Sequence, residues 1–216
     1  MITWEFFAGS RSFSKECELR GWETYTTDNQ DFEGINQVVD FFEFDIDKAI
    51  QETGKPNIIW FSPPCKYFSI ASCGYHWSKE GSIYTPKTEG AKLGLKMLDR
   101  INELIEILNP EYFIIENPRG MMRKMKKFDN YRRVTPWYCQ YGHNTAKPTD
   151  LWINFPLVVS QCSNGNELCH HERAPRGAKT GIQGIKGNYQ RSIVPRNLIN
   201  SILDQIEKPI IQGWIK

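Results

Sequence analysis

One cysteine of this 216-residue chain stands in a setting that suits a nucleophile. Cys65 follows two prolines in the segment Ser-Pro-Pro-Cys-Lys-Tyr-Phe-Ser, residues 62–69. The prolines fix the backbone just before the thiol and prevent a regular helix there, so the thiol is held in one geometry. An isolated cysteine is more often a buried structural residue, and we interpret Cys17 and Cys73, which lack this setting, in that way.

A carboxyl group follows another apolar run in the same manner. Glu116, Asn117 and Pro118 come directly after residues 112–115, which have the composition of a buried strand. These residues come at the carboxyl end of the predicted strand, the place where ligands of α/β sheets bind. Without Cys65, the simpler interpretation of Glu116 is an exposed turn residue.

Two further strand ends predict a nucleoside site. Ala8, Gly9 and Ser10 form a small-residue turn after the first apolar run, where a ligand can approach backbone N–H groups at a helix start. Asp28 ends the second run, at a position typical of a carboxylate that binds ribose hydroxyls. Taken alone, Asp28 is equally well explained as a helix cap.

The elements that must position these residues alternate between strand and helix patterns, which is typical of a parallel α/β sheet. Apolar strand-like runs occupy residues 2–7, 23–27, 41–44, 57–61 and 112–115. Helical patterns occupy residues 10–19, 47–52, 88–108 and 197–206. Ligands of such sheets bind at the carboxyl ends of the strands, where the residues singled out above are expected to meet.

The last third of the chain has a different character. Residues 133–141 and 151–155 predict an antiparallel pair of strands. Residues 156–190 show little periodicity and predict a small irregular insertion, which we call the recognition insertion. No repeat or linker divides the chain, so we expect one domain over residues 1–216.

The ordered motifs resemble those of the cytosine-C5 DNA methyltransferase family. They are Phe7-Ala8-Gly9-Ser10, then Pro63-Pro64-Cys65-x-x-Phe68-Ser69, then Glu116-Asn117-Pro118, with Tyr141-Gly142 and Ile193-Val194-Pro195 similar to later motifs. The resemblance implies a Rossmann-like S-adenosylmethionine-dependent methyltransferase. Its sheet would be mixed and mostly parallel, with helices on both faces and a small irregular insertion.

The resemblance also implies roles for individual residues. Cys65 would add to C6 of cytosine, Glu116 would hold a proton on N3, and Asn117 would brace the loops. Asp28 would bind the ribose hydroxyls of S-adenosylmethionine and Asp45 its adenine amino group. The full set implied for the cofactor is Phe7, Ala8, Gly9, Ser10, Asp28, Asp45 and Pro64.

The chain departs from the family pattern at several positions. Ser12 stands in place of the second glycine of the first motif, and Lys66 in place of the glutamine after the nucleophile. Two arginines expected after Tyr141-Gly142 are missing. Lys147 takes the place of the first, completing a catalytic set with Cys65 and Glu116, and Arg191 is a candidate replacement for the second, where Thr149 stands.

A cluster of cysteines and histidines in the recognition insertion predicts a zinc site. Cys162 and Cys169 supply two thiolates, and His170, alone or together with His171, supplies one or two imidazoles. Cys139 or His143 would be the fourth ligand. The spacing matches no standard zinc finger. The alternative is an ordinary loop with unpaired cysteines.

The charge distribution indicates two ligands of opposite sign. Residues 28–52 hold eight carboxylates and one lysine, whereas residues 119–133 and 173–196 hold seven and six cations. The basic runs fit a polyanion, and the acidic run fits a cationic cofactor. No apolar run approaches the roughly 20 residues that span a bilayer, and no secretory signal is visible. We expect a monomeric protein of the phage or restriction–modification type, located in the cytoplasm of a bacterium or of a phage-infected cell.

Together these features predict methyl transfer to C5 of cytosine in DNA through a covalent adduct with Cys65. Two alternatives stay open from the sequence. One is an enzyme that modifies free pyrimidine nucleotides at C5 by the same thiolate chemistry. The other is a catalytically weak DNA-binding relative.

Overall fold

A computed structural model describes residues 1–163, 166–172 and 187–208 of the chain. In this part of the chain a seven-stranded sheet runs in the order β3-β2-β1-β4-β7-β9-β8. The strands are β1 (Ile2–Phe6), β2 (Glu23–Asp28), β3 (Gln37–Val38), β4 (Ile58–Phe61), β7 (Tyr112–Pro118), β8 (Arg132–Val134) and β9 (Thr149–Ile153). The first five strands in the order are parallel, whereas β9 is antiparallel to both β7 and β8.

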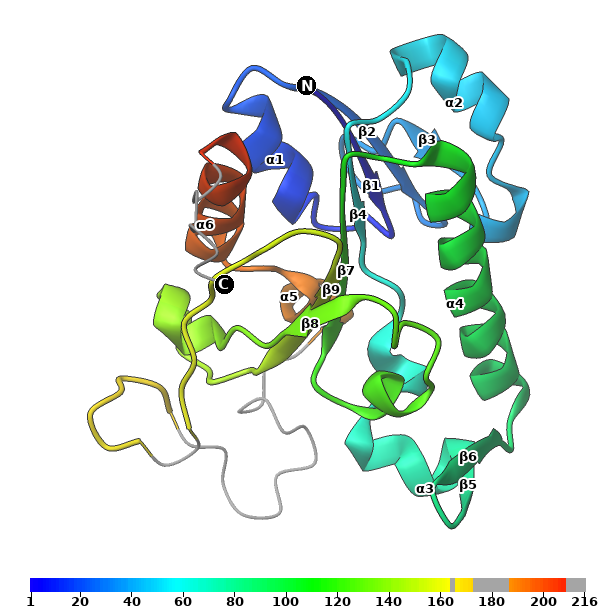
Figure 1. The fold of residues 1–216 in the computed structure, drawn as a ribbon, viewed down its shortest axis with the longest axis vertical. Coiled ribbons are helices and arrows are strands. Elements are labelled where there is room, and N and C mark those ends of the chain that lie inside the picture. The colour runs from blue at the N-terminus through cyan, green and yellow to red at the C-terminus, as the bar shows by residue number, and fades with distance from the viewer. Residues whose placement is uncertain (164–165, 173–186, 209–216) are drawn as a thin grey trace, which may run out of the picture.

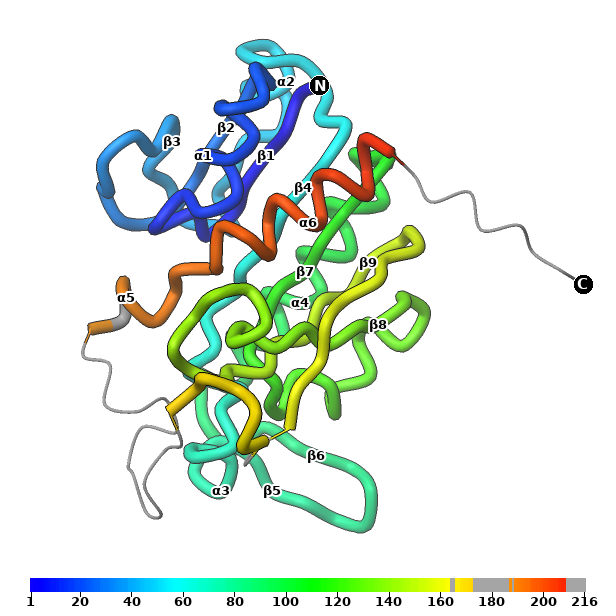
Figure 2. Tube along the Cα trace, turned by 90° about the vertical axis from the view of Figure 1, so that its left-hand side faces the viewer, coloured from blue at the N-terminus to red at the C-terminus, as the bar shows by residue number. Residues whose placement is uncertain are grey.

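Helices cover both faces of the sheet (Figure 1). One face is covered by α1 (Ser12–Glu18) and α6 (Arg196–Glu207), which contact each other and which Figure 2 shows in front of the strands. The other is covered by α2 (Ile46–Thr53) and α4 (Glu89–Leu108). The mixed, mostly parallel sheet confirms the predicted fold class, and the predicted antiparallel pair is β8 with β9.

Alternation along the central strands explains the two layers of core. In β4, Ile58 and Trp60 join the cluster under α1 and α6, whereas Ile59 and Phe61 join the cluster under α4. All four side chains are fully buried, as expected for a central strand with helices on both faces. The chain leaves β1 towards β2 on one side and continues from β4 on the other, so a topological switch point lies between β1 and β4, where ligands of such sheets bind.

Two strand predictions are wrong, one entirely and the other in its length. Residues 41–44 form no strand; Phe41–Glu43 is a 3-10 helix capped by the side chain of Asp40. Phe41 and Phe44, three residues apart, are both buried while the residues between them are exposed, which is a helical rather than a strand pattern. Similarly, the strand predicted over 133–141 is limited to β8, and a 3-10 helix, η5, follows at Tyr138–Tyr141.

The segment between the predicted nucleophile and α4 contains small elements that the sequence pattern did not indicate. A short helix α3 (Cys73–His76) leads into a hairpin of β5 (Trp77–Glu80) and β6 (Ile83–Pro86), which lies apart from the main sheet (Figure 2). In the recognition insertion, the described residues before 173 have turns and one isolated bridge, and α5 (Asn188–Ser192) begins near its end. None of the helices in the described part of the chain is long and apolar enough to cross a membrane.

Candidate active site

Cys65 lies directly beyond the carboxyl end of β4. The nucleophile loop (residues 62–69) leaves the strand through the two prolines, and Cys65 begins a 3-10 helix, η2 (Cys65–Tyr67). Cys65 is exposed, as a nucleophile for a large substrate must be. The side-chain amide of the buried Asn117 donates a hydrogen bond of 2.9 Å to the Pro63 carbonyl oxygen, and so braces this loop against β7.

Glycines allow close packing around the nucleophile loop. A Cβ at Gly120 would overlap the Phe68 carbonyl oxygen, so only glycine fits at this position. The next residue, Met121, uses this approach to donate its N–H to the same oxygen at 2.7 Å. On the other side, a Cβ at Gly94 of α4 would lie 3.0 Å from the ring of Phe68. The loop is therefore fixed between α4 and the turn after β7.

Glu116 is buried near the end of β7, and its charge acts on the thiol of Cys65. The hydroxyl of the buried Tyr138 donates to Glu116 Oε1 at 3.2 Å. Burial raises the pKa of Glu116, opposed by the positive charge of Lys147 and by hydrogen bonds from Tyr138 and Ser62. The exposed-turn interpretation of Glu116 is wrong, because only 6% of the residue is accessible.

Lys147 reaches the same place from the segment before β9. Its Nζ lies 4.6 Å from the centre of the Tyr138 ring and donates to the Arg191 carbonyl oxygen at 2.7 Å. Burial lowers the pKa of Lys147, while the negative charges of Glu116 and ionised Cys65 favour the ammonium form.

The charges of these neighbouring side chains change the pKa of the Cys65 thiol. The residue as a whole is exposed, but burial of its sulfur among the surrounding loops, followed by the negative charge of Glu116, raises the pKa of Cys65. Lys147 and Arg191 act in the opposite direction and stabilise the thiolate. The predicted set of Cys65, Glu116 and Lys147 is thus brought together, and Arg191 lies close enough to contribute to the electrostatics of the thiol.

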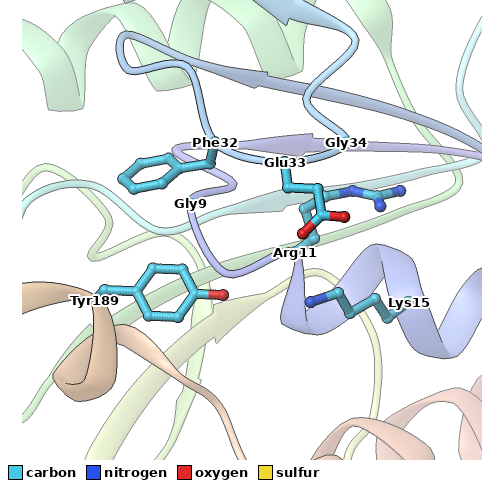
Figure 3. Close-up of a pocket in the computed structure, with 7 residues that line it drawn as sticks. All are labelled: Gly9, Arg11, Lys15, Phe32, Glu33, Gly34 and Tyr189. Carbon is cyan, nitrogen blue, oxygen red and sulfur yellow. The ribbon is translucent and has the colours of Figure 1, made fainter.

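The small-residue turn after β1 borders a cavity of about 510 Å³, which lies between this turn, the loop after β2 and α5 (Figure 3). Its walls comprise Gly9, Arg11, Lys15, Phe32, Glu33, Gly34 and Tyr189. The rings of Phe32 and Tyr189 lie together at one end, with centroids 5.8 Å apart, and the charged side chains lie at the other (Figure 3). This combination of an aromatic end and a charged end suits a ligand with a nucleoside part and an amino-acid part.

The residues predicted for the cofactor are placed around this turn in different ways. Asp28 Oδ2 accepts the N–H of Gly9 at 3.0 Å, which ties the end of β2 to the turn. Ala8 and Ser10 are buried, and Phe7 packs against Phe41 with ring centroids 4.6 Å apart. The predicted Pro64 lies in the nucleophile loop, immediately before η2.

Asp45 lies directly before α2, and its contact with the adenine amino group stays a prediction. Its side chain accepts the N–H of Lys48 at 3.0 Å and caps the N-terminus of α2, a role that explains its position before a helix. Asp45 does not line the cavity described above.

Ser12, which replaces a glycine of the family pattern, holds the turn by hydrogen bonds. Its hydroxyl lies 2.7 Å from that of Ser10 and accepts the N–H of Val194 at 3.2 Å. The serine therefore connects the small-residue turn after β1 (residues 8–10), which we call the cofactor turn, to the segment before α6.

Sequence reasoning missed several residues of the site. Tyr138, Phe32 and Tyr189 carry no motif, and only the folded chain brings them next to Glu116 or the cavity. Glu5 was missed as well, but the sequence does contain a signal for it, because a carboxylate inside an apolar strand is uncommon. Its side chain accepts the N–H groups of Phe13 and Ser14 and so caps α1.

The predicted metal ligands also come together, with one correction. Cys139, Cys162, Cys169 and His171 present their ligand atoms within 4.8 Å of one another. His170, which the sequence favoured, points elsewhere, because its Nε2 lies 3.2 Å from the His143 carbonyl oxygen.

The basic run at 119–133 is partly engaged within the protein. Arg123 forms an ion pair with the fully buried Asp150, and Lys127 pairs with Asp99 at 2.6 Å. The guanidinium of Arg119 lies 5.7 Å from the centre of the Trp137 ring. Most of the second basic run, including Arg173, Arg176, Lys179 and Lys186, lies outside the described residues.

Comparison with known proteins agrees with the geometry of the site. Over 222 aligned residues the chain is 31% identical to the "Probable DNA (cytosine-5)-methyltransferase" of Frog virus 3 (isolate Goorha). The alignment covers 93% of this chain and 97% of the viral protein. The fold is similar to that of the Entamoeba histolytica methyltransferase EhMeth, with a TM-score of 0.52 at 13% identity. That alignment covers 76% of this chain and 57% of the Entamoeba chain, and it bears on the fold alone.

The match to a defined family covers the cofactor turn, the nucleophile loop and the strand of Glu116 in one segment. Residues 3–135 match the family described as C-5 cytosine-specific DNA methylase. This segment is more than half of the chain, and the viral relative extends the similarity over almost all of it. The chain belongs to the C-5 cytosine-specific DNA methylase family.

Proposed function

We propose that this chain transfers a methyl group from S-adenosylmethionine to C5 of cytosine in DNA, through a covalent adduct between Cys65 and the base. The family and the viral relative are those of cytosine-5 DNA methyltransferases. The observation that carries the proposal is the meeting of an exposed thiol, a buried carboxyl group and a buried amine at Cys65, Glu116 and Lys147. Neither alternative considered from the sequence is favoured by the comparisons.

Addition of the Cys65 thiolate makes C5 of cytosine nucleophilic. C5 of cytosine is a poor nucleophile, so direct attack on an electrophilic methyl group is slow. When ionised Cys65 adds to C6, an S–C6 bond forms, the C5–C6 double bond is lost, and C5 becomes the nucleophilic carbon of an enamine. After transfer, the C5 proton passes to solvent, the S–C6 bond breaks to release the thiolate, and any proton taken up by the ring during addition returns to its donor.

Glu116 balances the charge of this addition. The electron pair displaced from the double bond moves towards N3, which accepts a proton as the adduct forms. Burial raises the pKa of Glu116, so the carboxyl group retains a proton at higher pH than an exposed one and can supply it to N3. Tyr138, whose hydroxyl bonds Oε1, orients the carboxyl group.

Lys147 and Arg191 stabilise the thiolate. Each lowers the pKa of Cys65, whereas an ionised Glu116 raises it. Protonation of Glu116 and ionisation of Cys65 therefore favour each other, and this is the combination of charges that the addition needs. We infer that these two cations take over the charge of the two arginines missing from the family pattern.

The cavity beside Gly9 fits the cofactor. Gly9 has a φ of +28°, a conformation that favours glycine, and a Cβ there would make ordinary contacts with Asp28 and Phe32 at 3.7 and 3.8 Å. Phe32 and Tyr189 would hold the adenine, and Lys15 and Glu33 the charged groups of the methionine part. When bound, S-adenosylmethionine supplies a methyl group made electrophilic by its sulfonium sulfur.

DNA is favoured over a free nucleotide by the charges around the site. A base within a duplex must rotate out of the stack to reach Cys65, and phosphate contacts must hold the flanking strand while this happens. Cations of 119–133 and 173–196 would make these contacts. The phage or bacterial origin and the monomeric state expected from the sequence stay predictions.

Transfer of labelled methyl groups tests the proposal directly. The wild-type chain should label cytosine in duplex DNA and leave free dCMP unlabelled. Label in dCMP alone would support an enzyme that modifies free nucleotides. Label in neither substrate would support a DNA-binding relative without catalytic activity. Glu116→Gln should lower the rate by about 10²-fold or more, because an amide bonds N3 but supplies no proton. Cys73→Ala, at a part-buried cysteine beyond the nucleophile loop, serves as the control and should retain full activity.

A further inference from the structure

Four side chains outside the active site present three sulfur atoms and one nitrogen to a common point. Cys139 lies in η5, and Cys162, Cys169 and His171 come from the recognition insertion. Their ligand atoms all lie within 4.8 Å of one another, and Cys139 and His171 are buried. The described residues contain no disulfide between these cysteines.

The spacing of the four atoms is close to that of a tetrahedral metal site. With Zn–S distances of about 2.3 Å, neighbouring sulfur atoms of such a site lie about 3.8 Å apart. Cys162 Sγ lies 4.0 Å from His171 Nδ1, so a shift of a few tenths of an ångström would bring both atoms within bonding distance of one ion. The imidazole would bind through Nδ1.

The surroundings of the sulfur atoms are also those of a metal thiolate site. The side-chain amide of Gln140 donates to Cys169 Sγ at 3.5 Å and to Cys139 Sγ at 3.8 Å. The amide of Asn166 donates to Cys162 Sγ at 3.5 Å. Amide N–H groups directed at sulfur stabilise the negative charge of thiolates and orient them towards a metal.

Backbone contacts hold the two halves of the cluster together. Trp137 N–H bonds the Ser160 carbonyl oxygen at 3.2 Å, just before Cys162. Glu172 N–H bonds the Asn144 carbonyl oxygen at 3.0 Å, just after His171. The ligands are thus placed by main-chain geometry and do not depend on flexible side chains alone.

We propose that Cys139, Cys162, Cys169 and His171 bind one structural Zn²⁺. Three thiolates and one imidazole are a common set for structural zinc, and four protein ligands leave no position for a substrate. The three thiol protons pass to solvent as the ion binds. The ion fixes the recognition insertion to η5, whose first residue, Tyr138, bonds the catalytic carboxyl group of Glu116.

Two neighbouring histidines offer a matched test. Full-length protein, purified after expression with zinc in the medium, should contain one zinc per chain by elemental mass spectrometry. His171→Asn should lose most of the metal, whereas His170→Asn, one residue away and outside the cluster, should keep it. Equal zinc content in the two variants would overturn the assignment of His171.

Titration with the metal alone covers the case in which His171→Asn does not fold. Co²⁺ added to the metal-free chain should produce the visible bands of tetrahedral thiolate coordination, and Zn²⁺ should displace them. Gln140→Ala, which leaves all four ligands in place, should weaken zinc binding about 10- to 100-fold, as changes next to metal ligands usually do. A folded wild-type chain that takes up neither ion, or that holds a disulfide among the three cysteines, would overturn the proposal.

Discussion

Glu5 gives the stability of the protein a pH dependence that one substitution can remove. The residue lies in β1 and is 3% accessible. Its carboxyl group accepts hydrogen bonds from Ser14 N at 2.8 Å, Ser14 Oγ at 2.6 Å and Phe13 N at 3.4 Å. Burial raises its pKa from 4.5 to about 7, although these bonds and the positive charge of Arg11 favour the ionised form.

The size and sign of the effect follow from this pKa. The rise from 4.5 to about 7 corresponds to about 3 kcal/mol of preference for the protonated form in the folded state. Between these two pH values the folded chain binds this proton and the unfolded chain does not, so stability falls as the pH rises. The contribution is complete below pH 4.5 and is lost above about pH 7.

Glu5→Gln keeps the shape of the side chain and removes its titration. The free energy of unfolding of the wild type should therefore fall by about 3 kcal/mol relative to the variant between pH 4.5 and about 7. Urea denaturation of both proteins at several pH values measures this difference. Glu23→Gln, at an exposed carboxyl group at the start of β2, should show no such change. Parallel curves for wild type and Glu5→Gln would refute the reasoning.

Three further predictions concern the site. Lys147→Met should slow alkylation of Cys65 by iodoacetamide at neutral pH, because a charge that stabilises the thiolate is lost; an unchanged rate would remove Lys147 from the mechanism. Gly120→Ala should lower stability by about 1–3 kcal/mol in thermal denaturation, since its Cβ meets the backbone of the nucleophile loop, while Gly74→Ala, with open space around it, should not. Because the recognition insertion is short, we expect a site of about two to four base pairs and salt-dependent DNA binding, weakened evenly across sequences when charges in 173–191 are removed. A unique six-base-pair site in bisulfite mapping would contradict this.

The central part of the fold could be predicted because its signals are local. Apolar runs that end in Ala8-Gly9-Ser10 or in Pro63-Pro64-Cys65 contain both the strand and the break that ends it, and each break proved to lie at the carboxyl edge of the sheet. The role of Asn117 was also anticipated, since its amide does brace the nucleophile loop.

The errors come from features that depend on partners distant in the sequence. A run of aromatic residues at 41–44 has strand composition, but its burial follows a helical spacing set by the core beneath it. The cap that Asp45 provides for α2 was not predicted either, although its position directly before a helix is a signal for one. The choice between His170 and His171 depends on which way the backbone turns next to residues 143–145, which no local pattern encodes.

The covalent step at Cys65 is tested most directly by trapping it. In DNA containing 5-fluorocytosine, fluorine replaces the C5 proton whose loss normally releases the enzyme, so the S–C6 bond should persist after methyl transfer. We predict that wild type and Cys73→Ala, incubated with this DNA and S-adenosylmethionine, form a complex that survives denaturing electrophoresis, and that Cys65→Ala, still folded, forms none. A stable complex with Cys65→Ala, or full methyl transfer by that variant, would contradict the mechanism.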